Sequence, residues 1–284
     1  MTYRHLKKEE IDSLLSNNCV AEDWTSVTVK EGFSPENIKN TRFEGIVKLG
    51  ISTGRIELEN NILKTCGIYS STINNCEIGN HVFISDVKDL SNYIVEENVA
   101  IYNVGSIAVN GESRFGNGTE IEVLNEGGGR ELPIFDRLSS QIGYLTVLYR
   151  HDKDFTEKIL RLIKDYCESK RSIRGRINTG TRIHDSLIIR NVLVGSHAVI
   201  SGASLLEEGT IQSCLEAPVF IGAGVTAKKF IVLSGSKIDG GVILEKSFVG
   251  QGVKMGKQFS SENSVFFANC EAFHGEACSL FAGP

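Results

Sequence analysis

The sequence has no apolar run that approaches the roughly 20 residues of a membrane-spanning helix, and its first residues, MTYRHLKKEE, are rich in charge. We therefore expect neither a signal peptide nor a membrane span, and we expect a cytoplasmic protein. An excess of basic residues is also absent, because the formal net charge is −5. Binding to nucleic acid needs a basic face that neutralises phosphates, so we expect no nucleic-acid partner.

Cysteine and histidine spacings that would hold a metal are lacking. The 7 cysteines are an odd number, lie far apart and include no C-x-x-C, so we expect reduced thiols. The 6 histidines include no closely spaced pair of the kind that zinc sites use. We therefore expect no metal and no permanently bound cofactor.

Proline is scarce, with 4 residues, whereas glycine is frequent, with 29. This balance suits a solenoid, whose tight turns need glycine. The second half repeats a six-residue unit that begins at positions 194, 200, 221, 238 and 249 with VGSHAV, ISGASL, IGAGVT, IDGGVI and VGQGVK. The first half is less regular, with isoleucines five or six residues apart at positions 56, 62, 68, 73, 78 and 84.

A period of six fits neither a helix nor a simple alternating strand, but it suits a short strand followed by a tight turn. In VGSHAVI we expect Val194, Ala198 and Ile200 to point inward, Gly195 to form the turn and Val199 to point outward. Three such units would close a triangular coil of about 18 residues, and stacked coils would bury one another's apolar rows. The pattern predicts a mainly β protein built as a parallel β-helix.

This repeat resembles that of the hexapeptide-repeat superfamily, which folds as a left-handed parallel β-helix. The resemblance covers residues 45–125 and 176–270. Together with NEGGGRE and NCEAFHGEACSLFAGP, the two blocks resemble an uncharacterised bacterial family of hexapeptide-repeat proteins, kin to the β-helix acyltransferases. The resemblance implies a left-handed coil, a homo-oligomer that is a trimer or a dimer, and a chain that continues beyond residue 284.

Between the two blocks the apolar residues follow a spacing of three and four, which predicts two amphipathic helices. Pro133 suits the first turn of the first helix, and Asp152 or Asp154 suits the cap of the second. A shorter helix is expected near residues 7–16. Outward residues such as Phe83 and Val199 should be covered by this helical hairpin or by another subunit. The predicted units are an N-terminal helix and arm at 1–44, a first β-helix block at 45–128, an inserted helical hairpin at 129–175 and a second β-helix block at 176–284.

The stretch NEGGGRELP places Gly127, Gly128, Gly129 and Arg130 just before the first expected helix of the hairpin. Glycine N–H groups and the positive end of a helix dipole can hold an anion, so these residues are candidates for binding a phosphate. The alternative is a joint, where a solenoid that must turn into a helix needs permissive residues.

Histidine is the usual general base of hexapeptide-repeat acyltransferases. His274 is the main candidate, with Glu276 beside it, because both lie in NCEAFHGEACSLFAGP, where the repeat fades. His197 is a weaker candidate at an outward corner of its repeat. His184 is followed by Asp185, but neighbours in a strand face opposite ways, so we do not expect them to form a pair.

The resemblance implies a hexapeptide-repeat transferase that moves an acyl group from acyl-CoA or a similar donor to a sugar or nucleotide sugar. His274 would act as base, and Arg130 with Arg174 and Arg176 would hold phosphate, although cations near a helix C-terminus also have a structural explanation. The alternative is a non-catalytic β-helix scaffold for binding or assembly. An enzyme should place His274 near an anion pocket, whereas a scaffold should pack His274 away and disperse the basic residues.

Overall fold

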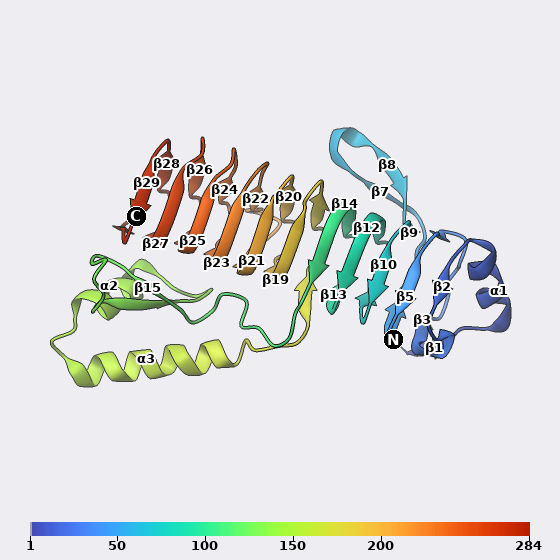
Figure 1. The fold of residues 1–284 in the computed structure, drawn as a ribbon, viewed down its shortest axis with the longest axis horizontal. Helices are drawn as coiled ribbons and strands as arrows, with labels where there is room; N and C mark the ends of the chain where they lie inside the picture. The colour runs from blue at the N-terminus through green and yellow to red at the C-terminus, as the bar shows by residue number, and fades with distance from the viewer. Residues whose placement is uncertain (1) are drawn as a thin grey trace.

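The computed structural model describes residues 2–284, and its dominant feature is one 26-stranded, largely parallel sheet that winds into stacked coils (Figure 1). The N-terminal end contains β1 (Tyr3–His5), α1 (Lys8–Ser16), β2 (Val20–Ala21), η1 (Trp24–Ser26), β3 (Val27–Lys30) and β4 (Ile38–Lys39). The first block contains β5 (Arg42–Glu44), β6 (Val47–Leu49), β7 (Arg55–Glu57), η2 (Glu59–Asn61), β8 (Leu63–Thr65), β9 (Gly67–Tyr69), β10 (Thr72–Asn74), β11 (Glu77–Ile78), β12 (Phe83–Ser91), β13 (Tyr93–Val95) and β14 (Ala100–Ala108). The mainly β prediction and the helix expected near residues 7–16 are confirmed.

The second block resumes the coil after an insertion that we define as residues 110–174. The insertion contains β15 (Thr119–Glu122), β16 (Glu131–Ile134), α2 (Ser140–Leu148) and α3 (Lys153–Glu168). The second block contains β17 (Gly175–Ile177), β18 (Arg182–His184), β19 (Ile188–Val194), β20 (Val199–Ser201), β21 (Leu205–Ile211), β22 (Phe220–Ile221), β23 (Thr226–Val232), β24 (Lys237–Ile238), β25 (Ile243–Val249), β26 (Lys254–Gly256), β27 (Ser260–Phe266), β28 (Glu271–Phe273), β29 (Glu276–Cys278) and β30 (Phe281–Ala282).

Most coils of the second block are 17 residues long. Ile188 pairs with Leu205, and Ile243 pairs with Ser260, both in parallel register, and the hydrogen bond that the N–H of Val253 donates to the Ser236 hydroxyl spans the same 17 residues. Residues at one position of the coil therefore form a column along the molecule. Inward columns make a continuous apolar core, as a solenoid requires.

The repeat that begins at Val194 behaves largely as expected. Val194, Ala198 and Ile200 are buried, and Val199 between them is only partly covered. The expectation that Gly195 forms the turn is wrong, because the left-handed backbone conformation belongs to His197, with φ of 58°. Gly195 is needed for a different reason, since a Cβ there would lie 2.3 Å from the backbone nitrogen of Ser213 in the next coil.

The two blocks form one continuous sheet across the insertion. β14 pairs directly with β18 and β19, so the coil before the insertion stacks on the coil after it. Tyr93 reinforces this contact from a fully buried position: its hydroxyl donates to the carbonyl of Val192 at 2.8 Å and accepts from the N–H of Val192 at 3.2 Å. The stack of coils is therefore unbroken, and the insertion projects from its side.

The insertion begins with a β-hairpin before its helices. Pro133 lies in β16, opposite Glu120 of the antiparallel partner β15, so the prediction that it starts a helix is wrong. The first helix begins only at Ser140, after Ser139 caps it by accepting from the N–H of Ile142. The second helix is capped by Asp152, one of the two caps expected. Within residues 2–284 we find no helix with the length and apolar character to span a membrane.

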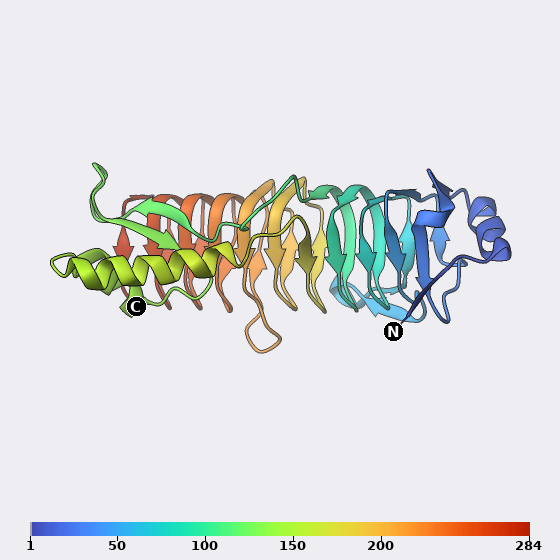
Figure 2. The same ribbon diagram turned by 90° about the horizontal axis from the view of Figure 1, so that it is seen from below.

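The insertion folds back along the second block and covers one face of its coils (Figure 2). Its apolar residues pack on outward-facing residues of β23, β25 and β27. The buried members of this interface are Ile121, Val123, Leu132, Ile134, Phe135, Leu138, Val147, Ile163 and Cys167 from the insertion, with Ile231, Leu233, Phe248, Val265 and Phe267 from the coils. A second apolar core therefore lies outside the coil.

A shorter excursion, the β7–β8 hairpin (residues 55–65), covers part of another face of the coils. Ile56 of this hairpin packs with Cys66, Phe83 and Ala100. Phe83 is 7% exposed. The expectation that outward residues are covered holds for Phe83, but its cover is the β7–β8 hairpin and not the helical hairpin.

Replacing Tyr93 with phenylalanine should destabilise the protein without creating a cavity, because it leaves the carbonyl and N–H of Val192 buried without a partner. An unsatisfied buried group costs about 1–3 kcal/mol. We expect the free energy of unfolding in urea to fall by this amount. Tyr144→Phe is the control, since that side chain is 52% exposed. Equal stabilities of the two variants would contradict the proposed role of the Tyr93 hydroxyl.

Candidate functional site

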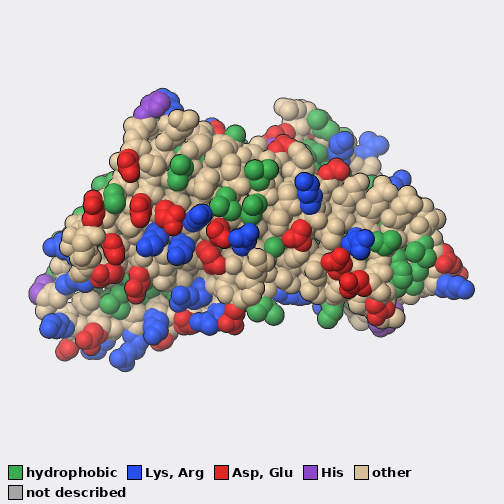
Figure 3. All heavy atoms as spheres, in the orientation of Figure 1, with side chains coloured by type: hydrophobic (Ala, Val, Ile, Leu, Met, Phe, Trp, Pro, Cys, Tyr) green, Lys and Arg blue, Asp and Glu red, His purple; other side chains and the backbone are tan. Residues whose placement is uncertain are grey.

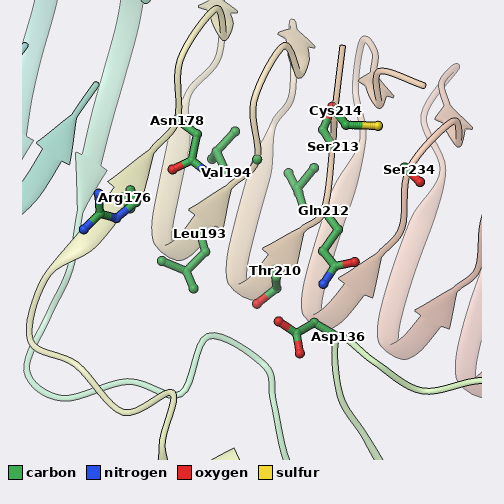
Figure 4. Close-up of a pocket in the computed structure, with 12 residues that line it drawn as sticks. Asp136, Arg176, Asn178, Leu193, Val194, Thr210, Gln212, Ser213, Cys214 and Ser234 are labelled. Atoms are coloured by element: carbon green, nitrogen blue, oxygen red, sulfur yellow. The ribbon is translucent and has the colours of Figure 1, made fainter. Parts of the chain in front are cut away.

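A cleft of about 440 Å³ opens where the insertion meets the coils. Arg176 and Asn178 border it at the end of β17, and Thr210 and Gln212 border it at the end of β21. Asp136, in the segment between β16 and α2, reaches it from the insertion (Figure 4). One side of the cleft is thus made of rigid stacked coils, and the other side is made by the segment of the insertion between β16 and α2.

One outward column explains why the cleft lies at this position. Leu193, Thr210, Ile231 and Phe248 are consecutive members of that column, since each pairs with the next. Ile231 and Phe248 are completely buried beneath the insertion. Leu193 and Thr210 instead line the cleft. The coil face therefore becomes apolar where the insertion covers it, and the cleft lies at the edge of that cover.

Asp136 is the carboxylate of the cleft and is only 6% exposed. It accepts a hydrogen bond from the Tyr166 hydroxyl at 2.6 Å and one from Lys170 Nζ at 2.8 Å. Burial lowers the pKa of Lys170, but the bonds to Asp136 and Tyr166 outweigh it and leave that pKa raised. Asp136 thus enters the cleft as a fixed negative group, tied to the end of α3 and the residues just after it.

Arg176 is the cation of the cleft. Its Nη1 donates to Glu96 Oε1 at 2.9 Å, and Glu96 also accepts from the N–H and the hydroxyl of Thr179. Burial raises the pKa of Glu96, but the bonds from Arg176 and Thr179 outweigh it and lower that pKa below its ordinary value. The Arg176 side chain is 51% exposed, which leaves its other donors accessible, and in Figure 4 its guanidinium is directed away from Asp136.

Two amide side chains add to the polar lining. Asn178 Oδ1 is buried and accepts no hydrogen bond from any residue in the range 2–284. An unpaired buried acceptor is unfavourable unless a ligand or water satisfies it. Gln212 borders the same cleft two coils further on (Figure 4). The cleft therefore presents a carboxylate, a guanidinium and two amides, which together both donate and accept hydrogen bonds.

The glycine stretch expected to cradle an anion is the tip of the β15–β16 hairpin. It does not precede a helix, so that premise of the prediction is wrong. The N–H groups of Gly127, Gly128 and Gly129 already donate within the loop, to Asn125 at 3.1 Å and 2.9 Å and to Glu131 at 2.6 Å. The loop is a closed turn that gives the chain its change of direction.

The other predicted site residues with charged or imidazole side chains do not line the cleft. These are Arg130 at the tip of the β15–β16 hairpin, Arg174 just before β17, His197 between β19 and β20, and His274 and Glu276 on the last coil. His274 is exposed and lies at a left-handed corner, with φ of 53°. Acidic and basic side chains are interspersed over the face seen in Figure 3. Of the predicted phosphate ligands, Arg176 lines the cleft, and the roles of the others stay predictions.

His184 and Asp185 do form a pair, which corrects the expectation drawn from strand alternation. His184 Nδ1 lies 2.8 Å from Asp185 Oδ2. Asp185 occupies a corner with φ of 53°, so the chain leaves the extended conformation and its carboxylate turns back to the imidazole. The His184 side chain is 4% exposed and lies beneath the β7–β8 hairpin. In residues 2–284, no three His, Cys, Asp or Glu side chains gather as a metal site would require.

Sequence reasoning missed Asp136, Asn178, Thr210 and Gln212. Asp136 carries a usable signal, because a charged residue in the apolar stretch LPIFDRL is unexpected in a packed segment. The other three become recognisable only once the coils are aligned 17 residues apart. These three residues form a cleft only together with Asp136, which is distant from them in sequence.

Comparisons with known proteins identify a family but no reaction. The family model described as "Domain of unknown function (DUF4954)" matches residues 3–284. An uncharacterized protein of Treponema pallidum (strain Nichols) is 26% identical over 247 residues, which cover 83% of this chain and 34% of that relative. The chain therefore spans about a third of the length of the relative.

Removing the Arg176 guanidinium should raise the pKa of Glu96 towards its ordinary value of 4.5. A carboxyl with a lowered pKa stabilises the fold above its unfolded value, and that stabilisation is lost as pH falls through the folded pKa. In Arg176→Ala we expect the Glu96 carboxyl to titrate at a higher pH, as followed by NMR, and its contribution to stability above the unfolded pKa to become smaller. Arg190→Ala, which removes an arginine paired with Glu207 at 2.9 Å, is the control and should leave Glu96 unchanged. An unchanged Glu96 titration in Arg176→Ala would show that the Arg176 guanidinium does not hold that carboxylate.

Proposed function

Because the chain belongs to the family described as Domain of unknown function (DUF4954), we propose a function from its cleft: the protein binds a nucleotide sugar or a related phosphorylated sugar. The observation that carries this proposal is that Arg176, Asp136 and the amide side chains of Asn178 and Gln212 all line one cleft. A phosphorylated sugar has both a strong anion and a set of hydroxyls, so it matches such a mixed lining.

The lining suits each part of this ligand. Arginine is well adapted to phosphate because its guanidinium fork can donate two parallel hydrogen bonds. The carboxylate of Asp136 and the amides of Asn178 and Gln212 can bind sugar hydroxyls, which both donate and accept. Leu193 adds an apolar surface for the C–H face of a sugar ring. The volume of about 440 Å³ falls in the common range for small-molecule sites, about 300–1,000 Å³.

The resemblance to hexapeptide-repeat proteins extends this proposal to a reaction. On that basis the coil is left-handed, the protein acts in the cytoplasm as a homo-oligomer, and the bound sugar accepts an acyl group from acyl-CoA or a similar donor. The 17-residue parallel register supports kinship in architecture. The reaction itself rests on the resemblance alone, because the exposed His274 lies outside the cleft.

A second candidate function is a non-catalytic scaffold for binding or assembly. The dispersal of Arg130, Arg174 and His274 over separate parts of the molecule favours it, since a phosphate site should gather its cations. The cleft fits both candidates, because a scaffold can also carry a ligand. Turnover of an acyl donor distinguishes the transferase from the scaffold.

We expect a nucleotide sugar such as a UDP-hexose to raise the melting temperature of the protein by linkage. In Arg176→Ala its affinity, measured by calorimetry, should fall about tenfold or more, since a hydrogen bond to a charged group contributes about 1.5–3 kcal/mol. Asn178→Ala should also weaken binding. Arg190→Ala is the matched control for a lost surface arginine, and Arg130→Ala tests the glycine loop.

Three outcomes decide among the alternatives. If Arg176→Ala binds as well as Arg190→Ala, the cleft is not the site. If only Arg130→Ala loses binding, the anion is held at the glycine loop. If the protein binds the sugar but releases no free thiol from acetyl-CoA in its presence, the scaffold is favoured over the acyltransferase.

A further inference from the structure

The β7–β8 hairpin closes over a histidine whose second ring nitrogen lacks a proper partner. The hairpin leaves the coil after β6 and returns at β9, and in Figure 1 it projects from the upper edge of the first block. One hydrogen bond fixes it to the coil beneath, from Arg182 Nε to the carbonyl of Glu57 at 3.2 Å, and Glu59 approaches His184. Ile56 adds the apolar contact with Phe83 and Ala100.

The imidazole of His184 is held in one orientation. Its Nδ1 bonds to Asp185, and its ring stacks on Tyr102 with centroids 4.9 Å apart and an interplanar angle of 3°. Asn103 donates to the other oxygen of Asp185. The bonds from His184 and Asn103 lower the pKa of the Asp185 carboxyl. Asp185 is therefore ionised at neutral pH, and Nδ1 of His184 must carry the hydrogen that it donates to Asp185.

This orientation aims Nε2 of His184 at the hairpin. Nε2 lies 3.0 Å from Glu59 Oε1, yet the atoms are not aligned as a hydrogen bond, and Nε2 is buried without another partner among residues 2–284. When Nδ1 carries the only ring hydrogen, Nε2 presents a lone pair to the carboxylate, and two acceptors repel each other. One added proton, on Nε2 or on Glu59, turns this contact into a favourable one.

We propose that the β7–β8 hairpin is a lid over the His184–Asp185 pair, and that its closure requires one proton shared between His184 and Glu59. The Glu59 side chain is 48% exposed, so it can leave the contact for water when the proton is lost. Protonation thus closes the lid, and deprotonation favours its opening. The protein links a change of charge at the His184–Glu59 contact to the position of residues 55–65.

The other titratable groups near this contact do not take over its role. Tyr102 lies under the ring, and burial, with the charges of Glu59 and Asp185, raises its pKa, so it stays neutral. The Arg182 guanidinium donates to the backbone carbonyls of Glu57, Asn98, Gly180 and Thr181. Burial lowers the pKa of the Arg182 guanidinium, and the nearby thiol Cys66 and acid Glu57 raise it. Among the described residues, only Glu59 faces Nε2.

Opening would expose a histidine that is already oriented for proton transfer. Asp185 would still hold Nδ1, and Nε2 would be free for a reacting group, an arrangement that suits general acid–base chemistry. The same movement would uncover Phe83 and Tyr102, whose rings lie 6.2 Å apart. The lid therefore controls access to both a base and an aromatic surface.

Hydrogen–deuterium exchange of residues 55–65 tests the proposal between about pH 5 and about pH 8. After correction for the intrinsic pH dependence of exchange, the protection of this segment should fall as pH rises, by up to about tenfold per pH unit for one linked proton. In Glu59→Gln the amide can donate to the bare Nε2 without titrating. We expect that variant to keep the lid protected at both ends of the range.

Glu57→Gln is the matched control, because it makes the same chemical change on the same hairpin at an exposed side chain that does not face His184. It should retain the pH dependence of the parent. Peptides from β23 serve as an internal reference for global stability. A pH-independent lid in the parent, or the same slope in Glu59→Gln as in the parent, would overturn the proposal.

Discussion

The stacking of coils 17 residues apart is the constraint from which the other features follow. Because Ile243 lies directly beside Ser260, a residue acts mainly through its column and only secondarily through its neighbours in sequence. Inward columns must be apolar to bury one another, and corner residues such as His197 must adopt a left-handed backbone. The residues of outward columns can differ from coil to coil. Some of them contact the insertion, and others line the cleft.

The outward column that contains Leu193, Thr210, Ile231 and Phe248 shows how this freedom makes a site. Its apolar members hold the insertion, and its earlier members remain at the edge of the cover. Asp136 binds Tyr166 and Lys170, which fixes the segment between β16 and α2 against the end of α3. Both sides of the cleft are therefore rigid. Polar side chains held this way keep their positions without a ligand, which reduces the entropy lost on binding.

The repeat predicts the inward residues well because burial and sequence period coincide there, as at Val194, Ala198 and Ile200. The three-and-four spacing that predicted a helix from Pro133 fails there, because Ile134 and Leu138 fit a helical spacing while Leu132 and Ile134 also fit the alternation of a strand. The cleft is harder still to predict. Arg176 was found from its charge, but its relation to Asp136 depends on how the insertion folds back, and no local pattern encodes that contact.

The pairing of His184 with Asp185 extends this reasoning to the corners. Strand alternation separates sequence neighbours onto opposite faces, and a left-handed residue cancels that separation by turning the chain within one step. Each coil has such corners, so adjacent side chains can meet there although they cannot meet along a strand. In this architecture, polar pairs that are close in sequence should therefore be sought at corners, and pairs that are distant in sequence should be sought along columns. His184 satisfies both conditions, since it meets Asp185 at a corner and stacks on Tyr102, its register partner in the preceding coil.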